Sequence, residues 1–394
     1  MRSDSIVITS AVRTPMGGLL GELKDFTAAQ LGSAAILAAL ERSQLQRQDI
    51  PEVIMGCVLT AGQGQAPARQ AALGAGLLQS TTCTTINKMC GSGMKAAMLA
   101  HDLIRAETHE IMLAGGMESM TNAPYLLAKA RGGYRLGHGQ LIDHQFLDGL
   151  EDAYERGRLM GSFAEATAKH FGLTREAQDQ FAITSLLRAQ AAIKDGTFDH
   201  EITPLTLKNK DGEKIISQDE TPLKARLDKI PLLKPAFSPD GTVTAANSSS
   251  ISDGAAALIL MRESHAEKLG LQPLARIVGH ASYAQEPAWF TTAPVFAIQR
   301  LLEKIHWQKD QVDLYEINEA FAVVTMVAMQ ELQLPHDKVN IHGGACALGH
   351  PIGASGARIL VTLLHALKKH QLKRGVASLC IGGGEATAMA VELM

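Results

Sequence analysis

The sequence predicts a duplicated α/β protein in which two similar halves pack side by side, with an insertion between them. The chain has 394 residues, which is more than one hydrophobic core usually supports. Hydrophobic residues make up 46% of it and charged residues 20%, an ordinary globular composition. A helix, a strand and a Gly-rich turn also recur in the same order in both halves.

The first repeated unit is a helix followed by a short strand. Apolar residues recur at helical spacing in residues 35–42, and a polar turn leads to the apolar residues 53–55. The same order runs from residues 297–304 to residues 314–317. This periodicity is typical of a helix with one buried face. Each stretch is therefore predicted to be one αβ unit.

The second repeated unit begins at a Gly-rich turn. Residues 91–95 open a predicted helix that leads into the strand 111–116. In the second half, residues 353–357 open a helix that leads into the strand 377–381. Alternating helices and strands favour largely parallel sheets with helices on their faces. Gene duplication is the simplest origin of this order.

Residues 121–248 differ in character from both repeats. A helix is predicted to begin at Thr174 and to end near Asp195 and Gly196, because glycine favours a helix end. Irregular, extended chain is expected after it, since prolines follow at Pro204, Pro222, Pro231, Pro235 and Pro239. We interpret the segment as loops that cap the first half and build a binding site. A flexible surface excursion is the alternative.

Charge and composition exclude several classes of function. The formal net charge of −3 provides no basic field to attract nucleic acid. No stretch approaches the roughly 20 apolar residues that span a bilayer, so no membrane partner is expected. The N-terminal residues 1–8 lack the pattern of a secretory signal, and a cytoplasmic location is expected. Neither a dinucleotide-binding nor a phosphate-loop fingerprint is present.

The cysteines point away from disulfides and metals. They form an odd set without CxxC spacing, namely Cys57, Cys83, Cys90, Cys346 and Cys380. Neither a disulfide framework nor a zinc site is supported by such a set, so free thiols and no metal are expected. A small buried side chain is the ordinary role of each one.

Cys90 has the neighbourhood of a nucleophile. It lies at a predicted strand-to-helix turn, followed by Gly91 and Gly93. The unpaired N–H groups and the dipole of a helix N-terminus favour a thiolate over a thiol. The glycines allow a tight turn and the close approach of a substrate. A buried structural cysteine is the alternative.

Three residues of the second half complete a candidate active site. His350 ends the turn before the second repeated helix, so it can face Cys90 across the pseudo-twofold axis. Cys380 lies at the end of the last predicted strand, before the Gly-rich residues 382–384, where a thiol can act as acid and base. Asn318 follows the strand 314–317, and its amide can hold a water molecule. Each alone is more often structural, but together with Cys90 they indicate one active site.

Four segments resemble the motifs of the thiolase family: the sequence around Cys90, residues 318–321, residues 349–351 and residues 380–384. The resemblance covers nearly the whole chain and implies a duplicated five-layer αβαβα fold with an inserted loop domain. The regions that it implies are an N-terminal half carrying the nucleophile (1–120 and 249–270), a loop domain that binds coenzyme A (121–248), and a C-terminal half carrying the Asn, the His and the second Cys (271–394).

The resemblance implies an acetyl-CoA C-acetyltransferase that joins two acetyl-CoA into acetoacetyl-CoA plus CoA, or runs the reverse thiolysis. His350 takes the proton of Cys90, which carries the acetyl group. Cys380 takes a proton from C2 of the second acetyl-CoA. One oxyanion hole is His350 with a water held by Asn318, and the other is the N–H groups of Cys90 and Gly382. Coenzyme A is substrate and product, so no separate cofactor is implied.

The family likeness also assigns contacts to coenzyme A. Pantetheine is expected beside Met160, Ala245 and Ser249, in a slot lined by Phe237, Ala320 and Phe321. Trp289 and Phe290 match a region that shapes the acyl pocket, with plain core packing as the alternative. Many relatives have Asn where this chain has His342, and His where it has Leu159. They often have Arg near Pro222, which leaves Lys224 or Arg226 as the phosphate partner here.

Two other functions share these motifs. A broad or longer-chain 3-ketoacyl-CoA thiolase of fatty-acid β-oxidation would use every catalytic residue and differ in its acyl pocket. A non-catalytic acyl-CoA-binding protein is the other, although all four catalytic positions are filled. A decarboxylating ketosynthase is excluded because that branch usually needs a second His where this chain has Cys380. The resemblance further implies a homotetramer or homodimer, with part of the insertion in the tetramer contacts.

Overall fold

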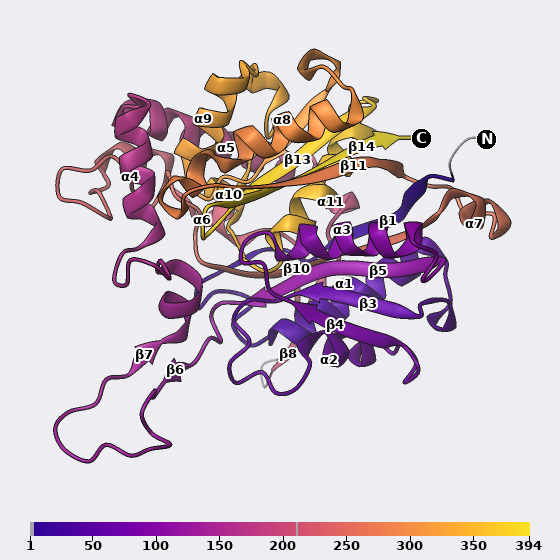
Figure 1. Ribbon diagram of the computed structural model, residues 1–394, viewed down its shortest axis with the longest axis horizontal. Coiled ribbons are helices and arrows are strands. Elements are labelled where there is room, and N and C mark those ends of the chain that lie inside the picture. Colours follow the sequence, from indigo (N-terminus) through magenta and orange to yellow (C-terminus); the bar gives the residue numbers. More distant parts are fainter. Residues whose placement is uncertain (1–3, 210–211) are drawn as a thin grey trace.

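Two β-sheets with a pair of helices between them form the body of the protein. The computed structural model describes residues 4–209 and 212–394, and Figure 1 traces the chain through them. Residues 1–3, part of the N-terminus in which no secretory signal is predicted, lie outside the described residues. None of the described helices combines the length and the apolar character that a bilayer crossing requires.

The strands of the two halves follow the same spatial order. The first half contains, in this order, β1 (Ile6–Arg13), β10 (Ser252–Arg262), β5 (Ile111–Ser119), β3 (Glu52–Gly56) and β4 (Thr82–Ile86). The second contains β11 (Ala275–Ala284), β14 (Glu385–Leu393), β13 (Arg374–Ile381) and β12 (Leu314–Ile317). A short pairing of β1 with β11 joins the two sheets. The predicted duplication is confirmed, because both repeated units occupy equivalent places in their sheets.

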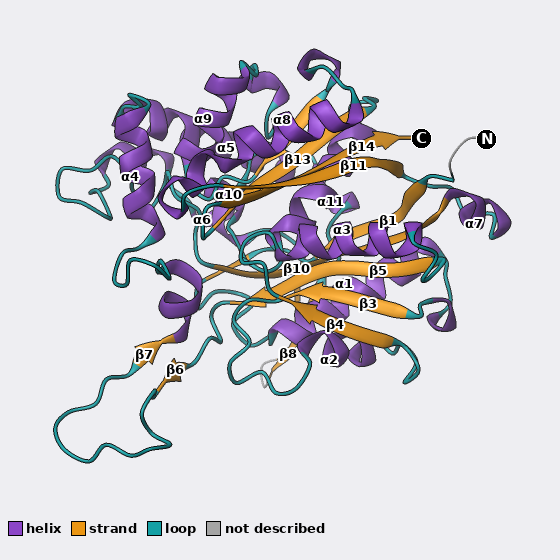
Figure 2. Ribbon diagram, viewed as in Figure 1, coloured by secondary structure: helices purple, strands orange, loops and turns teal. Residues whose placement is uncertain are grey.

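Helices form three layers around the two sheets (Figure 2). The outer layers are α1 (Ala28–Ser43) with α2 (Pro67–Gly74), and α8 (Ala293–Ile305) with α9 (Ala322–Leu332). The central layer is α3 (Ser92–Arg105) with α11 (Ser355–Lys369), and α11 contacts strands of both sheets. The predicted five-layer αβαβα arrangement is confirmed.

The sheets are mixed, and the prediction of largely parallel sheets was wrong. Strand β3 runs parallel to β4 and β5, and β12 runs parallel to β13. The remaining long pairings are antiparallel, because β10 enters from the insertion and β14 returns from β13 through a tight turn. A tight turn joins antiparallel neighbours, whereas parallel neighbours need a crossover. The Gly-rich residues 382–384 form that turn.

Two glycines allow the central helices to approach closely. A Cβ on Gly93 would lie 2.7 Å from the backbone nitrogen of Ala357, and a Cβ on Gly356 would lie 2.4 Å from that of Met94. Both distances are shorter than side-chain contacts in folded proteins. Backbone therefore meets backbone at the N-terminal ends of α3 and α11. This approach brings the turns that precede the two helices, with Cys90 and His350, to one place.

The insertion contributes helices and hairpins beside that place. Helix α5 (Arg175–Lys194) begins after Thr174, whose hydroxyl accepts a hydrogen bond from Ala177 N at 3.2 Å, and it ends at Asp195. This helix is confirmed as predicted. The other elements are β6 (Tyr125–Leu126), β7 (Ile142–Asp143), α4 (Met160–His170), β8 (Leu205–Asn209), β9 (Gly212–Ile216) and α6 (Glu220–Lys224). Irregular chain was expected from Pro204 to Pro239, but the long irregular stretch begins only at residue 233 and runs to residue 251. The β8–β9 hairpin follows Pro204, and Pro222 lies in the first turn of α6, where a helix tolerates proline because that N–H needs no partner.

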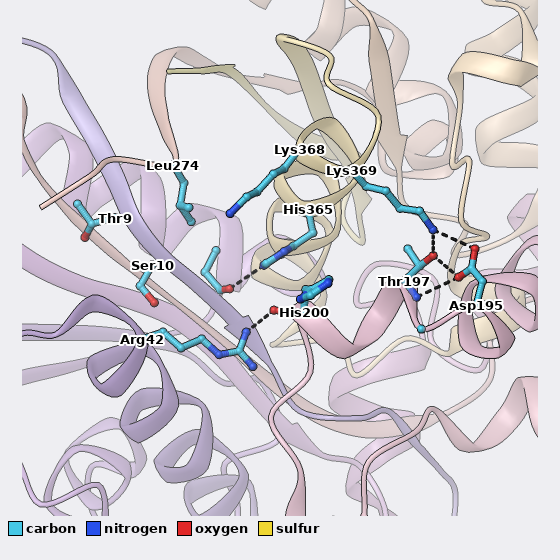
Figure 3. Close-up of a pocket in the computed structure, with 12 residues that line it drawn as sticks. Thr9, Ser10, Arg42, Asp195, Thr197, His200, Leu274, His365, Lys368 and Lys369 are labelled. Atoms are coloured by element: carbon cyan, nitrogen blue, oxygen red, sulfur yellow. Dashed lines mark hydrogen bonds and ion pairs between the residues drawn. The ribbon is translucent and has the colours of Figure 1, made fainter.

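Ion pairs fasten the insertion to both halves. The buried Arg13 of β1 pairs with Asp219 at 2.6 Å and with Glu201 at 2.5 Å. Lys369, at the end of α11, pairs with Asp195 at 2.9 Å (Figure 3). Breaking a buried pair leaves an uncompensated charge, so the insertion is held firmly over the two halves.

Candidate active site

A cavity of about 370 Å³ lies where both halves and the insertion meet. Cys90 comes from the first half, Met160 and Phe237 from the insertion, and His350 and Gly382 from the second half. The wall is mainly apolar with a few polar groups, which is the character of a small-molecule site. The predicted nucleophile and the predicted base therefore share one cavity.

Cys90 is held at the start of α3 by its backbone. Met89 has a positive φ of 46°, and Gly91 follows as the N-cap. The backbone N–H groups of Gly382 and of Cys90 itself lower the pKa of the thiol, but burial dominates and raises it to about 11. The prediction of a thiolate favoured by the helix was therefore wrong for the resting protein. The thiol needs a base before it can react.

His350 supplies an imidazole nitrogen for that purpose. Its Nδ1 lies 2.5 Å from Ser355 Oγ, and the Ser355 hydroxyl donates to the Pro351 carbonyl at 3.0 Å. The Nδ1 proton is therefore donated to Ser355, which leaves Nε2 as an acceptor. Nε2 is buried and has no hydrogen-bond partner among the described residues. Burial lowers the pKa of His350 to about 3, so the ring is neutral.

Asn318 and Cys380 lie behind the cavity wall. The Asn318 amide nitrogen is 3.4 Å from His350 Nδ1, and its oxygen is 3.5 Å from Nη2 of the buried Arg358. Cys380 is completely buried. Burial raises the pKa of its thiol well above the ordinary value, and the charge of Cys90 raises it further. Neither residue belongs to the lining, but each lies beside one that does.

The Gly-rich turn after β13 places a backbone donor at Cys90. Gly383 and Gly384 have φ values of 91° and 87°, a conformation that other residues rarely adopt. A Cβ on Gly384 would also lie 2.3 Å from the carbonyl oxygen of Gln285. This turn places Gly382 in the cavity with Cys90, where its backbone N–H lowers the pKa of the thiol.

Most residues assigned to coenzyme A from the sequence line the cavity, and one does not. The lining includes Met160, Ala245, Ser249, Phe237, Ala320, Phe321 and Phe290. Lys224 lies outside the lining, where it is exposed and paired with Glu220. Of the two neighbouring aromatic residues, Phe290 faces the cavity, whereas Trp289 packs against His170 at 5.0 Å between ring centroids.

Several residues that support the site were missed in the sequence. Glu118 is buried on β5 and accepts hydrogen bonds from the backbone N–H groups of Val58 at 2.9 Å, Leu59 at 3.1 Å and Gly353 at 2.9 Å. It fixes the turn after His350 to the first half, and burial raises its pKa to about 7. The sequence signal available for Glu118 was a charged residue inside an otherwise apolar strand. No such signal marked the apolar residues of the lining, namely Met89, Phe146, Leu150, Ile251 and Ile352.

A second buried carboxylate supports the other side of His350. Glu319 accepts hydrogen bonds from Ser185 Oγ of α5 at 2.7 Å and from the Asn340 amide at 2.8 Å. It also accepts from the N–H of Cys346 at 3.1 Å. The segment that leads to His350 is thus tied to the insertion and to β12 at once.

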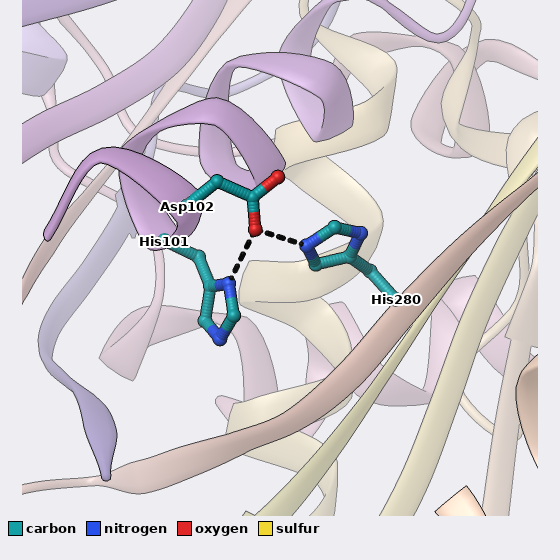
Figure 4. A group of neighbouring side chains, drawn as sticks. All are labelled: His101, Asp102 and His280. Atoms are coloured by element: carbon teal, nitrogen blue, oxygen red, sulfur yellow. Dashed lines mark hydrogen bonds and ion pairs between the residues drawn. The ribbon is translucent and has the colours of Figure 1, made fainter. Parts of the chain in front are cut away.

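A group of three side chains of the types that bind metal ions lies away from this cavity. Asp102 accepts hydrogen bonds from His101 Nδ1 and His280 Nε2, each at 2.9 Å (Figure 4), and the ligand atoms of the three residues lie within 4.8 Å of one another. None of them lines the cavity of Cys90. The group links α3 of the first half to β11 of the second.

All five cysteines are free thiols, as expected.

Comparisons with known proteins agree with this architecture. Residues 6–264 match the model of the thiolase N-terminal domain, and residues 271–393 match that of the thiolase C-terminal domain. The acetyl-CoA acetyltransferase of Cupriavidus necator is 48% identical over 98% of this chain and 99% of its own.

Two solved structures are similar throughout. The acetyl-CoA acetyltransferase of Bacillus anthracis superimposes with a TM-score of 0.96 at 42% identity, covering 99% of each chain. The Acat5 thiolase of Ascaris suum in complex with coenzyme A superimposes with a TM-score of 0.93 at 41% identity, covering 99% of this chain and 100% of its own. With its two matched domains and its shared cavity of Cys90 and His350, this chain belongs to the thiolase family.

Proposed function

We propose that this protein is an acetyl-CoA C-acetyltransferase, which condenses two acetyl-CoA into acetoacetyl-CoA and CoA or runs the reverse thiolysis. The observation that carries the proposal is the meeting of Cys90 and His350 in one mainly apolar cavity. The N–H of Gly382 at the sulfur supports it further. A binding protein without chemistry would not need a buried thiol, an unpaired imidazole nitrogen and backbone donors at one point.

The first half-reaction forms an acetyl thioester on Cys90. His350 Nε2 accepts the thiol proton, and the sulfur attacks the carbonyl carbon of acetyl-CoA. The bond to the sulfur of coenzyme A breaks, and Cys380 gives that sulfur its proton, so CoA leaves as a thiol. Because the pKa of the Cys90 thiol is raised to about 11, a base within the cavity is required at neutral pH.

The second half-reaction joins the two acetyl groups. The Cys380 thiolate removes a proton from C2 of a second acetyl-CoA, and the enolate attacks the acetyl group on Cys90. The carbon–sulfur bond to Cys90 then breaks, and His350 returns the proton to that sulfur. Burial makes the Cys380 thiolate a strong base, because it raises the pKa of the thiol. All proton donors are thereby restored.

Each half-reaction places negative charge on an oxygen. We assign the N–H groups of Cys90 and Gly382 to the oxygen of the acetyl group on Cys90. We assign His350, with a water held by Asn318, to the oxygen of the enolate. Preorganised donors of this kind each contribute about 10²–10³ in rate. Release of CoA before the second substrate reacts predicts ping-pong kinetics.

Aromatic side chains favour a short acyl group. Phe237 and Phe321 pack edge to face at 6.0 Å between centroids, and Phe290 packs in the same way on Phe163 at 6.2 Å. All three line the cavity; Phe237 and Phe321 are assigned to the pantetheine slot, and the bulk of Phe290 is assigned to limiting the acyl chain. The longer-chain thiolase remains the alternative.

An assay across chain lengths tests the acetyl preference. Thiolysis of 3-ketoacyl-CoA substrates from four to sixteen carbons should give kcat/KM highest for acetoacetyl-CoA, about 10²-fold or more above the long chains. Comparable turnover of long chains would establish the alternative. Lack of turnover with every substrate, in folded protein, would point to a non-catalytic acyl-CoA-binding protein.

Coenzyme A is assigned to the insertion side of the cavity, with pantetheine beside Met160, Ala245 and Ser249 and with Lys224 or Arg226 near the phosphates.

We also propose that the protein is a homotetramer or homodimer and that it is located in the cytoplasm. Support for a tetramer comes from the loop between β6 and β7, which extends from the body (Figure 1) and exposes Leu136 by 98% and Leu141 by 71%. Light scattering of the wild type and of a Leu136→Ser, Leu141→Ser variant tests this: a smaller particle in the variant is expected.

A further inference from the structure

A second cavity, of about 540 Å³, lies on the opposite side of the central helix from the turn that carries His350. It is formed by β1 and by the C-terminal ends of α1, α5 and α11 (Figure 3). None of its lining residues belongs to the cavity of Cys90. The mechanism above makes no use of it.

Thr9 and Ser10 line this cavity, and their hydroxyl oxygens are buried without hydrogen-bond partners among the described residues. Thr9 is 8% exposed and Ser10 is 2% exposed. The pairing of β1 with β10 shifts register between Ile8 and Ser10. Such a bulge redirects side chains, and here both hydroxyl-bearing residues border the cavity. Buried polar groups are normally satisfied, so these two hydroxyls point to a missing partner.

The other polar groups around the cavity are mainly cationic. Arg42 comes from α1, and Lys368 and Lys369 come from the end of α11. Asp195 is the single carboxylate in the lining, and it is already paired with Lys369. Arg42 donates to the carbonyls of His200 and Ile202, which fixes its guanidinium in place. Lys368 extends into the cavity (Figure 3) and has no ion pair or hydrogen bond within the described part of the chain.

We propose that this cavity binds a small phosphate-bearing anion. Lys369 is paired with the single carboxylate, so Arg42 and Lys368 leave a net positive charge that attracts an anion and disfavours a metal ion. A phosphate group has several strong acceptor oxygens, which match donors arriving from β1 and from α11 at once. Thr9 and Ser10 then donate to the anion, and Lys368 and Lys369 neutralise it. The volume exceeds that of one phosphate, so the group can be part of pyrophosphate or of a nucleotide.

Calorimetric titration of the full chain with sodium pyrophosphate, with ADP and with sodium acetate at equal ionic strength tests the proposal. One site should appear for pyrophosphate and none for acetate. Binding of ADP as well as pyrophosphate would identify the phosphate group itself as the ligand, whereas binding of ADP alone would identify a nucleotide. Absence of binding by both phosphate compounds, or equal binding of acetate, would overturn the proposal.

Variants distinguish binding of the anion in this cavity from binding in the region proposed for the phosphates of coenzyme A. Lys368→Gln should weaken pyrophosphate binding about tenfold, as expected for loss of one charge-assisted contact. Ser10→Ala should also weaken it, while leaving the thermal midpoint of the anion-free protein unchanged or higher, because it removes an unsatisfied buried hydroxyl. The matched control is Lys268→Gln on the exposed α7 (Glu263–Lys268). Unchanged binding in both cavity variants would place the anion elsewhere and contradict the proposal.

Discussion

His350 and Ser355 lie 2.5 Å apart, from Nδ1 to Oγ, at the point where the turn after His350 enters α11. This contact decides which ring nitrogen carries the proton. The Nε2 lone pair is then directed away from Ser355 and is the acceptor available to the cavity. Because burial lowers the pKa of His350 to about 3, the ring stays neutral and able to accept a proton at physiological pH.

Replacement of Ser355 tests the role of this contact. Ser355→Ala should lower kcat by about 10–10²-fold, less than the roughly 10²–10⁴-fold that a general base itself contributes, with a smaller change in KM. The Ser355→Thr variant keeps the hydroxyl and should recover most of the loss. A merely structural role would instead lower the thermal midpoint in both variants and leave kcat per folded molecule unchanged. Steady-state kinetics with thermal unfolding distinguish the two results.

Asn318 provides a second test of the catalytic assignment. Asn318→Ala should lower kcat by about 10²-fold, as expected for loss of one oxyanion donor, while acetylation of Cys90 in the first half-reaction continues. Rapid-quench measurement of both half-reactions checks this. Equal slowing of both steps would show that Asn318 acts by holding His350 in place, since its amide lies 3.4 Å from Nδ1.

The glycine contact between the central helices should be critical for stability. Gly356→Ala places a Cβ 2.4 Å from the backbone nitrogen of Met94, and overpacking of this kind costs about 1–3 kcal/mol. The thermal midpoint should fall, and activity should fall with it because the turns of Cys90 and His350 move apart. Gly132→Ala, where nothing lies within 4 Å, is the control. Equal midpoints for both variants would contradict the account.

The contribution of His342 to stability should be lost as the pH falls from about 6.5 to about 4. Burial lowers the pKa of His342 from 6.5 to about 4, so the unfolded chain binds a proton in this range that the folded protein rejects. Stability is therefore full above pH 6.5 and decreases as the pH falls. His342→Asn should flatten this dependence in urea unfolding, and the exposed His138→Asn should not. An unchanged slope in His342→Asn would show that other groups control it.

The sequence predicted the repeats well because each depends on local periodicity. The helix and strand of residues 35–55 and their equivalents at 297–317 lie where expected. The antiparallel return of β14 was not predicted, because the Gly-rich turn at residues 382–384 has the same appearance before a crossover as before a hairpin. The order of strands in the second sheet depends on that turn, because the turn places β14 beside β13.

The electrostatics of the site were less predictable. The helix N-terminus at Cys90 suggested a thiolate, but burial by segments distant in the chain outweighs it and raises the pKa to about 11. The role of Glu118 also depends on a contact between the halves, whereas that of Ser355 depends on the local turn that brings its hydroxyl to His350. Sequence patterns identify reactive residue types, whereas burial and hydrogen bonding appear only when the chain is folded.

Mass spectrometry of the acyl-enzyme tests the shared cavity most directly. After the protein is mixed with acetyl-CoA and quenched with acid, the peptide that contains Cys90 should carry one acetyl group. The Cys380→Ser variant should form this adduct more slowly, because it lacks the acid for the departing CoA, and should then retain it, because it lacks the base for the second half-reaction. Cys90→Ala should lack the adduct. An acetyl group on Cys380 instead, or no adduct on Cys90 in the folded wild type, would contradict the account.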